Sequence, residues 1–292
     1  MEISKHRGVG QIALGFFLLS HPGPVAFHIA AVAAFAIFAA WGHLVWGVIA
    51  LVVAAHAAMQ LSIAMLNDYA DRRLDARSKP GKPLVRGLVT PGEALGAGIF
   101  MMLLMLALLL WLNPLALVIS LAYLALGQAY NFGVKSTPWS GLVFSLAIAL
   151  IPLYALAGVN RITPASFWVV PVGFLVGVAL NLANSLPDIE GDQAGGARTL
   201  AVLLGVRGAF LCCPLLIALA VALAASLIAL GVVPAQPWMA LALLAVAVVA
   251  IGTMALFFGP QKPLATRQGY FYLVASTSLI LGLGWFIIVT VY

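Results

Sequence analysis

The stretch that decides the fold runs from Asn67 to Ala76 and reads N-D-Y-A-D-R-R-L-D-A. Its outline returns from Asn184 to Ala194 as N-S-L-P-D-I-E-G-D-Q-A, 117 residues further along the chain. The recurring positions are Asn67, Asp71 and Asp75, then Asn184, Asp188 and Asp192. Each copy closes a long apolar segment, so the sequence predicts two acidic clusters at matching ends of two membrane helices. Ionised groups at a membrane boundary are costly to bury and tend to mark function.

The composition is that of an integral membrane protein. Hydrophobic residues make up 64% of the 292 residues and charged residues 8%, with a mean hydropathy of +1.13. Soluble proteins have roughly 45–50% apolar and about 25% charged residues. A spanning helix needs about 20 apolar residues. We therefore predict an all-α fold of nine spans, at 24–41, 43–66, 94–112, 114–130, 139–158, 166–186, 208–231, 236–258 and 269–291.

The charge pattern predicts the orientation of a single membrane-embedded domain, 1–292, with a pseudo-repeat at 67–75 and 184–192. Of the 14 Lys and Arg residues, all but Arg161 fall on one side of the nine spans. By the positive-inside rule that side is cytoplasmic. It holds the N-terminus and both acidic clusters, and the odd number of spans puts the C-terminus on the other side. Residues 8–20 read as a membrane-surface segment or the beginning of a helix. The net charge of +6 reflects this topology and gives no reason to invoke nucleic acid.

Helical spacing aligns the carboxylates of each cluster. At about 100° per residue, Asp68, Asp71 and Asp75 fall within an arc of about 60° if the second helix continues beyond the membrane. In the sixth span an arc of about 100° holds a second polar stripe, from which Glu190 points away, and Pro187 should kink or end that helix. The stripe consists of Asn181, Asn184, Ser185, Asp188 and Asp192. Solvated loop aspartates and amides that bond a neighbouring helix are the structural alternative. The same spacing of Asn and Asp in both clusters favours the functional interpretation over this structural one.

Paired carboxylates suit a hard cation. Mg²⁺ is commonly held by one or two carboxylates together with phosphate oxygens and water, so two clusters predict two ions. Basic residues near the clusters could neutralise charge on a departing diphosphate: Lys79, Lys82, Arg86, Lys135 and Arg198. Arg72, Arg73 and Arg207 are interpreted as topological anchors. Tyr123 and Tyr130 either stack on a cationic or aromatic reactant or belong to the interfacial aromatic belt.

These residues resemble the UbiA superfamily of intramembrane prenyltransferases. Its first motif, N-D-x-x-D-x-x-x-D, matches at Asn67 to Asp75, and K-P-x-K-P-L-x-x-G matches at Lys79 to Gly87. Its second motif, D-x-x-x-D, matches at Asp188 and Asp192, and Tyr130 to Lys135 resembles the family's Y-x-x-x-x-K. The similarity covers essentially the whole chain, including the number of helices.

The resemblance implies nine helices around a central cavity, capped on the cytoplasmic side by the 67–93 and 187–207 loops. It implies Mg²⁺-dependent transfer of a prenyl group from an allylic prenyl diphosphate to a lipophilic acceptor, often an electron-rich ring. The implied metal ligands are Asp68, Asp71, Asp75, Asp188 and Asp192. The catalytic residues would be Asp71, Asp188, Lys135 and Tyr130. The substrate-binding residues would be Asn67, Lys79, Lys82, Arg86, Asn184 and Arg198.

The acceptor stays open at this point. Many relatives carry Asp where this chain has Ser185, which leaves the second site one carboxylate fewer. The stretch 186–205 looks closest to homogentisate and geranylgeranylglyceryl-phosphate prenyltransferases, and an ether-lipid acceptor is therefore the alternative to an aromatic one. The D-G-x-x-A-R motif of CDP-alcohol phosphotransferases is absent. A transporter built from two halves is disfavoured, because no acidic residue lies in the middle of a span.

Overall fold

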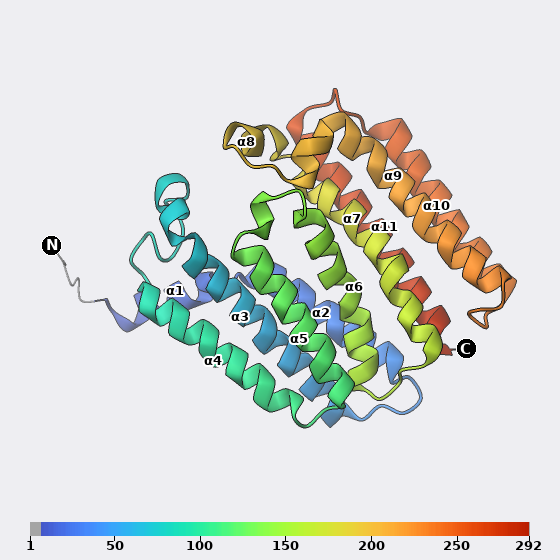
Figure 1. The fold of residues 1–292 in the computed structure, drawn as a ribbon, viewed down its shortest axis with the longest axis horizontal. Helices are drawn as coiled ribbons and strands as arrows, with labels where there is room; N and C mark the ends of the chain where they lie inside the picture. The colour runs from blue at the N-terminus through green and yellow to red at the C-terminus, as the bar shows by residue number, and fades with distance from the viewer. Residues whose placement is uncertain (1–6, 292) are drawn as a thin grey trace.

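The computed structural model describes residues 7–291, and within that range every regular element is a helix (Figure 1). The elements are α1 (Val9–Leu19), α2 (Pro22–Ala39), α3 (Trp46–Ser78), α4 (Pro91–Leu109), α5 (Pro114–Asn131), η1 (Val134–Ser136), α6 (Ser140–Gly158), η2 (Pro164–Trp168), α7 (Val169–Ser185), α8 (Ile189–Ala194), α9 (Leu200–Ala229), α10 (Pro237–Phe257) and α11 (Leu264–Val291).

Nine spans are present in the described part of the chain, as the sequence predicts. The helices α2 to α7 and α9 to α11 are each long and apolar enough to cross a membrane. The protein is therefore a multi-pass membrane protein, and α1 accounts for the predicted segment at 8–20. Helix α9 begins earlier than the predicted span at 208–231. It contains a kink at Gly205, where the backbone has a φ of 65°, a value that glycine tolerates. The kink separates the first turn of α9 from the membrane-spanning part of the helix.

Proline and polar caps set many of the helix boundaries. Pro91 and Pro114 occupy the first positions of α4 and α5, where a missing N–H costs no hydrogen bond. The Thr90 hydroxyl accepts a hydrogen bond from the Glu93 amide at 3.2 Å and so caps α4. Helix α7 ends at Ser185, two residues before Pro187, which confirms the predicted break.

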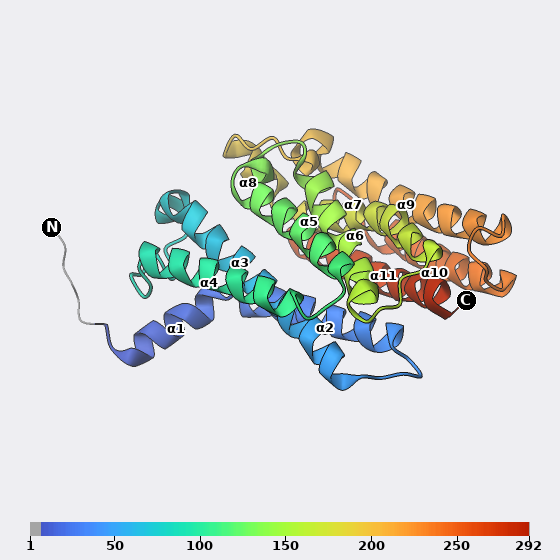
Figure 2. The ribbon, with the colours of Figure 1, turned by 60° about the horizontal axis from the view of Figure 1, so that its bottom comes forward.

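The spans form two large hydrophobic cores, beside two small clusters of buried residues. One core is built from α2 to α6, and the other from α7 and α9 to α11. In Figure 2, α9, α10 and α11 pack together away from α4. Helices α6 and α7 join the two cores at very close range, because a Cβ added to Gly177 would lie 2.9 Å from the Ser145 Cα. The absence of a side chain at Gly177 therefore allows α6 and α7 to approach this closely.

The acidic segments gather at one end of the molecule. In Figure 1 the last turns of α3, the connection between α5 and α6, and α8 all lie at the same end, and α11 ends at the opposite end. The two segments predicted as cap loops are partly helical, and their role as caps stays a prediction. Residues 67–78 continue α3, and the 187–207 segment contains α8 and the first turns of α9. Helix propagation explains the helical part of the first segment, since no proline or glycine interrupts 67–78.

Candidate functional site

Helix α3 carries the first acidic cluster beyond the membrane. At about 1.5 Å per residue its 33 residues span roughly 50 Å, well over the roughly 30 Å of a hydrocarbon core. The predicted continuation of this helix is confirmed, and it places Asp68, Asp71 and Asp75 on one face. Asp68 and Asp75 are each only 2% exposed. Buried carboxylates require cationic partners.

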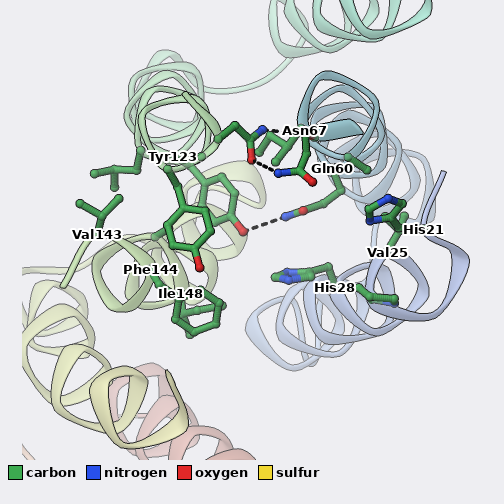
Figure 3. Close-up of a pocket in the computed structure, with 17 residues that line it drawn as sticks. His21, Val25, His28, Gln60, Asn67, Tyr123, Val143, Phe144 and Ile148 are labelled. Atoms are coloured by element: carbon green, nitrogen blue, oxygen red, sulfur yellow. Dashed lines mark hydrogen bonds between the residues drawn. The ribbon is translucent and has the colours of Figure 1, made fainter. Parts of the chain in front are cut away.

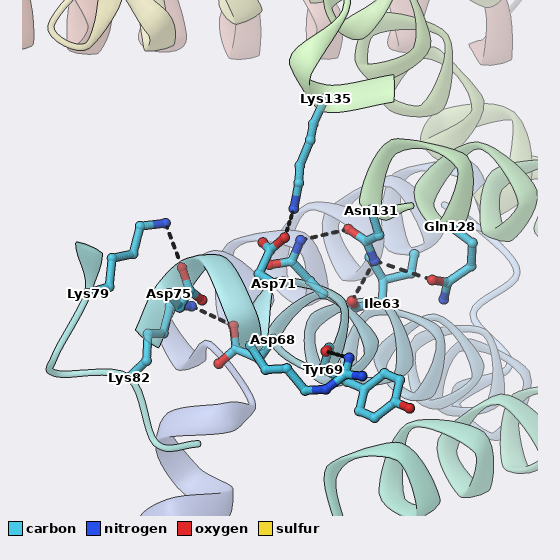
Figure 4. A network of polar contacts seen from close by, with 12 residues as sticks. Ile63, Asp68, Tyr69, Asp71, Asp75, Lys79, Lys82, Gln128, Asn131 and Lys135 are labelled. Carbon is cyan, nitrogen blue, oxygen red and sulfur yellow. Dashed lines mark hydrogen bonds and ion pairs between the residues drawn. The ribbon is translucent and has the colours of Figure 1, made fainter. Parts of the chain in front are cut away.

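Each aspartate of the first cluster has a lysine beside it (Figure 4). The Lys82 ammonium donates to Asp68 Oδ1 at 2.5 Å. The Lys135 ammonium donates to an oxygen of Asp71, and Lys79 lies 3.4 Å from Asp75 Oδ1. These are three of the five basic residues that the sequence singles out. We call this set the lysine–aspartate pairs.

His21 is a fourth partner, which the sequence analysis missed. Its Nε2 lies 2.9 Å from Asp68 Oδ1 and 3.2 Å from the Lys82 ammonium nitrogen. The residue is the N-cap of α2 and has φ of 48°, a left-handed conformation. Nothing in its spacing links it to Asp68, 47 residues away. A polar residue at the start of a span, on the side of the acidic clusters, was the one available signal.

Two buried carboxylate oxygens in this cluster accept no hydrogen bond from any residue that the structure describes. They are Asp68 Oδ2 and Asp75 Oδ1, and the second has only the ion pair with Lys79. Such oxygens fit the ligands that Mg²⁺ prefers. Within residues 7–291, however, no three Asp, Glu, His or Cys side chains stand close enough to hold one ion between them. The assignment of five metal ligands therefore remains a prediction.

The second cluster is divided between two helices. Asn184 is exposed at the end of α7, Asp188 is the exposed N-cap of α8, and Asp192 is half-buried within α8. The predicted break at Pro187 separates the stripe, so that Asn184 lies on α7 whereas Asp188 and Asp192 lie at the start of α8 and within it. Glu190 does point away from the cluster, because its Oε2 accepts a hydrogen bond from Arg267 at 2.7 Å.

The α5–α6 connection contacts both the first cluster and the segment that follows the second. The Arg198 amide donates to the Ser136 carbonyl at 3.1 Å, next to Lys135, whose ammonium contacts Asp71. Burial raises the pKa of the Asp192 carboxyl, the charge of Asp188 raises it further, and the positive charge of Lys79 lowers it. Lys79 therefore acts on carboxylates of both clusters.

Other predicted site residues lie around this polar end. Asn67 donates to Asn131 Oδ1 at 2.9 Å, and Asn131 donates to the Ile63 carbonyl, so both tie α3 to α5. Arg86 and Arg198 are exposed, and neither forms an ion pair in the part of the chain that the structure describes.

A cavity of about 220 Å³ opens beneath the first cluster (Figure 3). Its walls come from α2, α3, α5 and α6, and His21 and Asn67 lie at its polar end. Tyr130 lines it, and so does Tyr123, which is 6% exposed. Both tyrosines therefore face the interior, which excludes the interfacial belt for Tyr123. The central cavity expected from the resemblance is thus formed by one half of the molecule.

Fold and site together define a multi-pass membrane protein with an apolar cavity beneath an end rich in aspartate and lysine. The chain belongs to the UbiA prenyltransferase family, whose sequence model matches residues 26–276. This confirms the resemblance seen in the two motifs.

Among curated proteins, the chain is similar to digeranylgeranylglyceryl phosphate synthases. It is 34% identical to that of Pyrococcus abyssi over 49% of this chain and 52% of the relative. It is 33% identical to that of Methanoregula boonei over 66% of this chain and 69% of the relative. It is 29% identical to the 4-hydroxybenzoate octaprenyltransferase of Saccharophagus degradans over 64% of each protein. The matched segment thus spans about half the length of the Pyrococcus relative.

Solved structures share the fold. A structure of a digeranylgeranylglyceryl phosphate synthase superposes with a TM-score of 0.77 at 17% identity, covering 96% of this chain and 99% of that one. A UbiA homologue from Archaeoglobus fulgidus, bound to GPP and Mg²⁺, gives a TM-score of 0.66 at 17% identity, over 93% of this chain and 99% of that one.

Proposed function

We propose that this protein transfers a prenyl group from an allylic prenyl diphosphate to a lipophilic, aromatic acceptor in the membrane, with Mg²⁺ at its acidic end. The observation that carries the proposal is the position of the lysine–aspartate pairs over an apolar cavity. Membership of the UbiA family and the GPP and Mg²⁺ bound to the Archaeoglobus homologue support it.

The carboxylates of α3 and α8 would hold the metal, as two ions. They are Asp68, Asp71, Asp75, Asp188 and Asp192. Bound Mg²⁺ would neutralise the diphosphate and so favour its departure. Asp68 Oδ2 and Asp75 Oδ1, which are buried and accept no hydrogen bond from the described residues, support this role.

Lys79, Lys82 and Lys135 would bind the diphosphate oxygens. Each ammonium lies beside a carboxylate in the structure, so positive charge is already held at this end. Charge-assisted hydrogen bonds to phosphate are strong, and they favour the leaving group as its negative charge develops. Arg86 and Arg198 would extend this basic surface, and Asn67 and Asn184 would orient the ligands.

The cavity would protect the reactive carbon. When the allylic C–O bond breaks, the electron pair leaves with the diphosphate, and the carbon becomes cationic. The Tyr130 ring lines the cavity and offers a π-face that stabilises such a cation. Apolar walls exclude water, so the acceptor forms the new bond and then releases a proton.

The test is prenyl transfer by purified variants with radiolabelled geranylgeranyl diphosphate, Mg²⁺ and a panel of acceptors. Asp71→Asn and Asp188→Asn should lower turnover at least about 100-fold, because each removes a carboxylate ligand of the Mg²⁺ that would neutralise the leaving group. Glu93→Gln is the matched control: Glu93 pairs with Arg7 at the start of α4, outside both motifs. Undiminished turnover in the two aspartate variants would remove the metal assignment.

A second candidate acceptor is geranylgeranylglyceryl phosphate. The Pyrococcus and Methanoregula relatives are named for the product of such a reaction. The exposed guanidinium groups of Arg86 and Arg198 would suit the phosphate of such an acceptor. Mass spectrometry of products from the acceptor panel separates the two candidates.

We also propose that the acidic end is cytoplasmic. The bias of basic residues toward that side supports it, and α11 ends at the opposite end of the molecule. Labelling of single cysteines at positions 86 and 161 in intact cells should modify only the second from outside.

A further inference from the structure

The inner end of the cavity is polar, although it lies deep within the spans. His28 of α2, Gln60 of α3 and Tyr123 of α5 line the cavity there (Figure 3). We call these three residues the polar floor. Hydrocarbon alone would leave the unused donors and acceptors of these residues without hydrogen-bond partners, which is costly in an apolar environment. The polar floor therefore favours a ligand that forms hydrogen bonds with these side chains.

Three helices place the floor at the same depth. Gln60 lies eight residues before Asp68 on α3, and Tyr123 eight residues before Asn131 on α5. His28 lies seven residues after His21 on α2. At 1.5 Å per residue, each is about 10–12 Å below the polar end. That depth accommodates an allylic carbon together with one substituted ring.

The floor has unused hydrogen-bonding capacity. Gln60 Nε2 donates to the Tyr123 hydroxyl oxygen at 2.8 Å and lies 3.1 Å from His56 Nε2. Among the described residues, the Tyr123 hydroxyl proton has no acceptor, Gln60 Oε1 accepts nothing, and His28 forms no hydrogen bond. Behind the floor, His56 is 1% exposed and its Nδ1 has no partner. A hydroxyl group could accept from Tyr123 and donate to Gln60.

The cavity walls also exclude charge. No Lys, Arg, Asp or Glu occurs among its described lining residues. A carboxylate or phosphate at the floor would lie far from the lysines of the polar end, and an unpaired ion is expensive there. The ligand group that reaches the floor is therefore uncharged.

We propose that the polar floor binds an uncharged hydroxyl or carbonyl substituent of a ring-shaped acceptor, holding the opposite edge of the ring toward the lysine–aspartate pairs. This rests on the proposed prenyl transfer and deepens it by naming the acceptor class. The floor is a specificity determinant, since it touches the acceptor away from the reacting carbon.

The first test is binding without turnover, using 1-naphthol, naphthalene and 1-naphthoate as probes of one ring size. Equilibrium dialysis against detergent-solubilised protein, corrected with protein-free micelles, should show 1-naphthol about tenfold tighter than naphthalene, the value of one hydrogen bond. Tyr123→Phe and His28→Phe should reduce that preference. Tyr154→Phe should retain it, because this hydroxyl donates to the Val52 carbonyl and does not line the cavity.

Equal affinity for 1-naphthol and naphthalene, tightest binding of 1-naphthoate, or an equal loss in Tyr154→Phe would each overturn the proposal. In the transfer assay, Tyr123→Phe should raise the KM for a hydroxylated ring acceptor about tenfold and leave that for the prenyl diphosphate unchanged. A raised KM for the diphosphate instead would mean that the prenyl chain occupies the floor. Because the probes need neither Mg²⁺ nor diphosphate, failure of prenyl transfer itself would be distinguishable from failure of this inference.

Discussion

Arg267 fixes α8, and its replacement should loosen the second acidic cluster. The residue is 9% exposed in the first turn of α11. Its Nη1 donates to Glu190 Oε2 at 2.7 Å and to the Leu186 carbonyl at 3.2 Å. These two acceptors flank Asp188 on either side. Arg267 therefore connects a distant helix to the segment that carries Asp188.

The two contacts of Arg267 determine how much its replacement should lower the local opening free energy. The Glu190 side chain is 57% exposed, so solvent screens the ion pair and leaves it at about 0–1 kcal/mol. The hydrogen bond to the Leu186 carbonyl is buried and contributes about 1 kcal/mol. Arg267→Gln should therefore lower the local opening free energy of 186–195 by about 1–2 kcal/mol. In the fast-closing regime this corresponds to roughly 5- to 30-fold faster amide exchange.

Hydrogen exchange followed by mass spectrometry of peptides covering 186–195 measures this. Arg7→Gln is a closely matched control, because Arg7 makes the same kind of contacts at α4. It donates to the Leu88 carbonyl at 3.1 Å and to Glu93 at 2.7 Å. Unchanged exchange of 186–195 in Arg267→Gln, or an equal increase in Arg7→Gln, would refute the reasoning.

Two further substitutions test the fold and the metal end. Gly177→Ala should lower the thermal unfolding midpoint, because the added Cβ would meet the α6 backbone and overpacking costs about 1–3 kcal/mol. The control is Gly252→Ala, which should leave the midpoint unchanged because the added Cβ has open space around it. Lys82→Met should destabilise the ligand-free protein by up to about 3 kcal/mol, since Asp68 loses its closest cation. Added Mg²⁺ should then raise the midpoint by more than in wild type; an equal rise would argue against metal binding by Asp68. Lys262→Met is the control for that variant, because among the described residues its ammonium contacts just the Phe257 carbonyl.

The sequence predictions that the structure confirms were based on regular patterns of apolar and acidic residues. Apolar runs of about 20 residues gave nine spans, and the i, i+3, i+7 spacing put Asp68, Asp71 and Asp75 on one face of α3. Pro187 correctly predicted the end of α7. The roles of the site residues in metal and substrate binding stay predictions.

Contacts between distant segments escaped prediction, because no local pattern encodes them. His21 reaches Asp68 across 47 residues, and Gln60 reaches Tyr123 across 63. The helical spacing places the polar stripe of the second cluster on one helical wheel, although α7 and α8 are separate elements. A helical wheel gives directions only within an unbroken helix.

The one-sided origin of the cavity has a consequence for engineering. Every described residue lining it lies between positions 21 and 148, whereas α8 with its two aspartates belongs to the other half. Libraries that reshape the pocket can therefore be confined to the first half of the gene, leaving the second acidic motif in its parental sequence background.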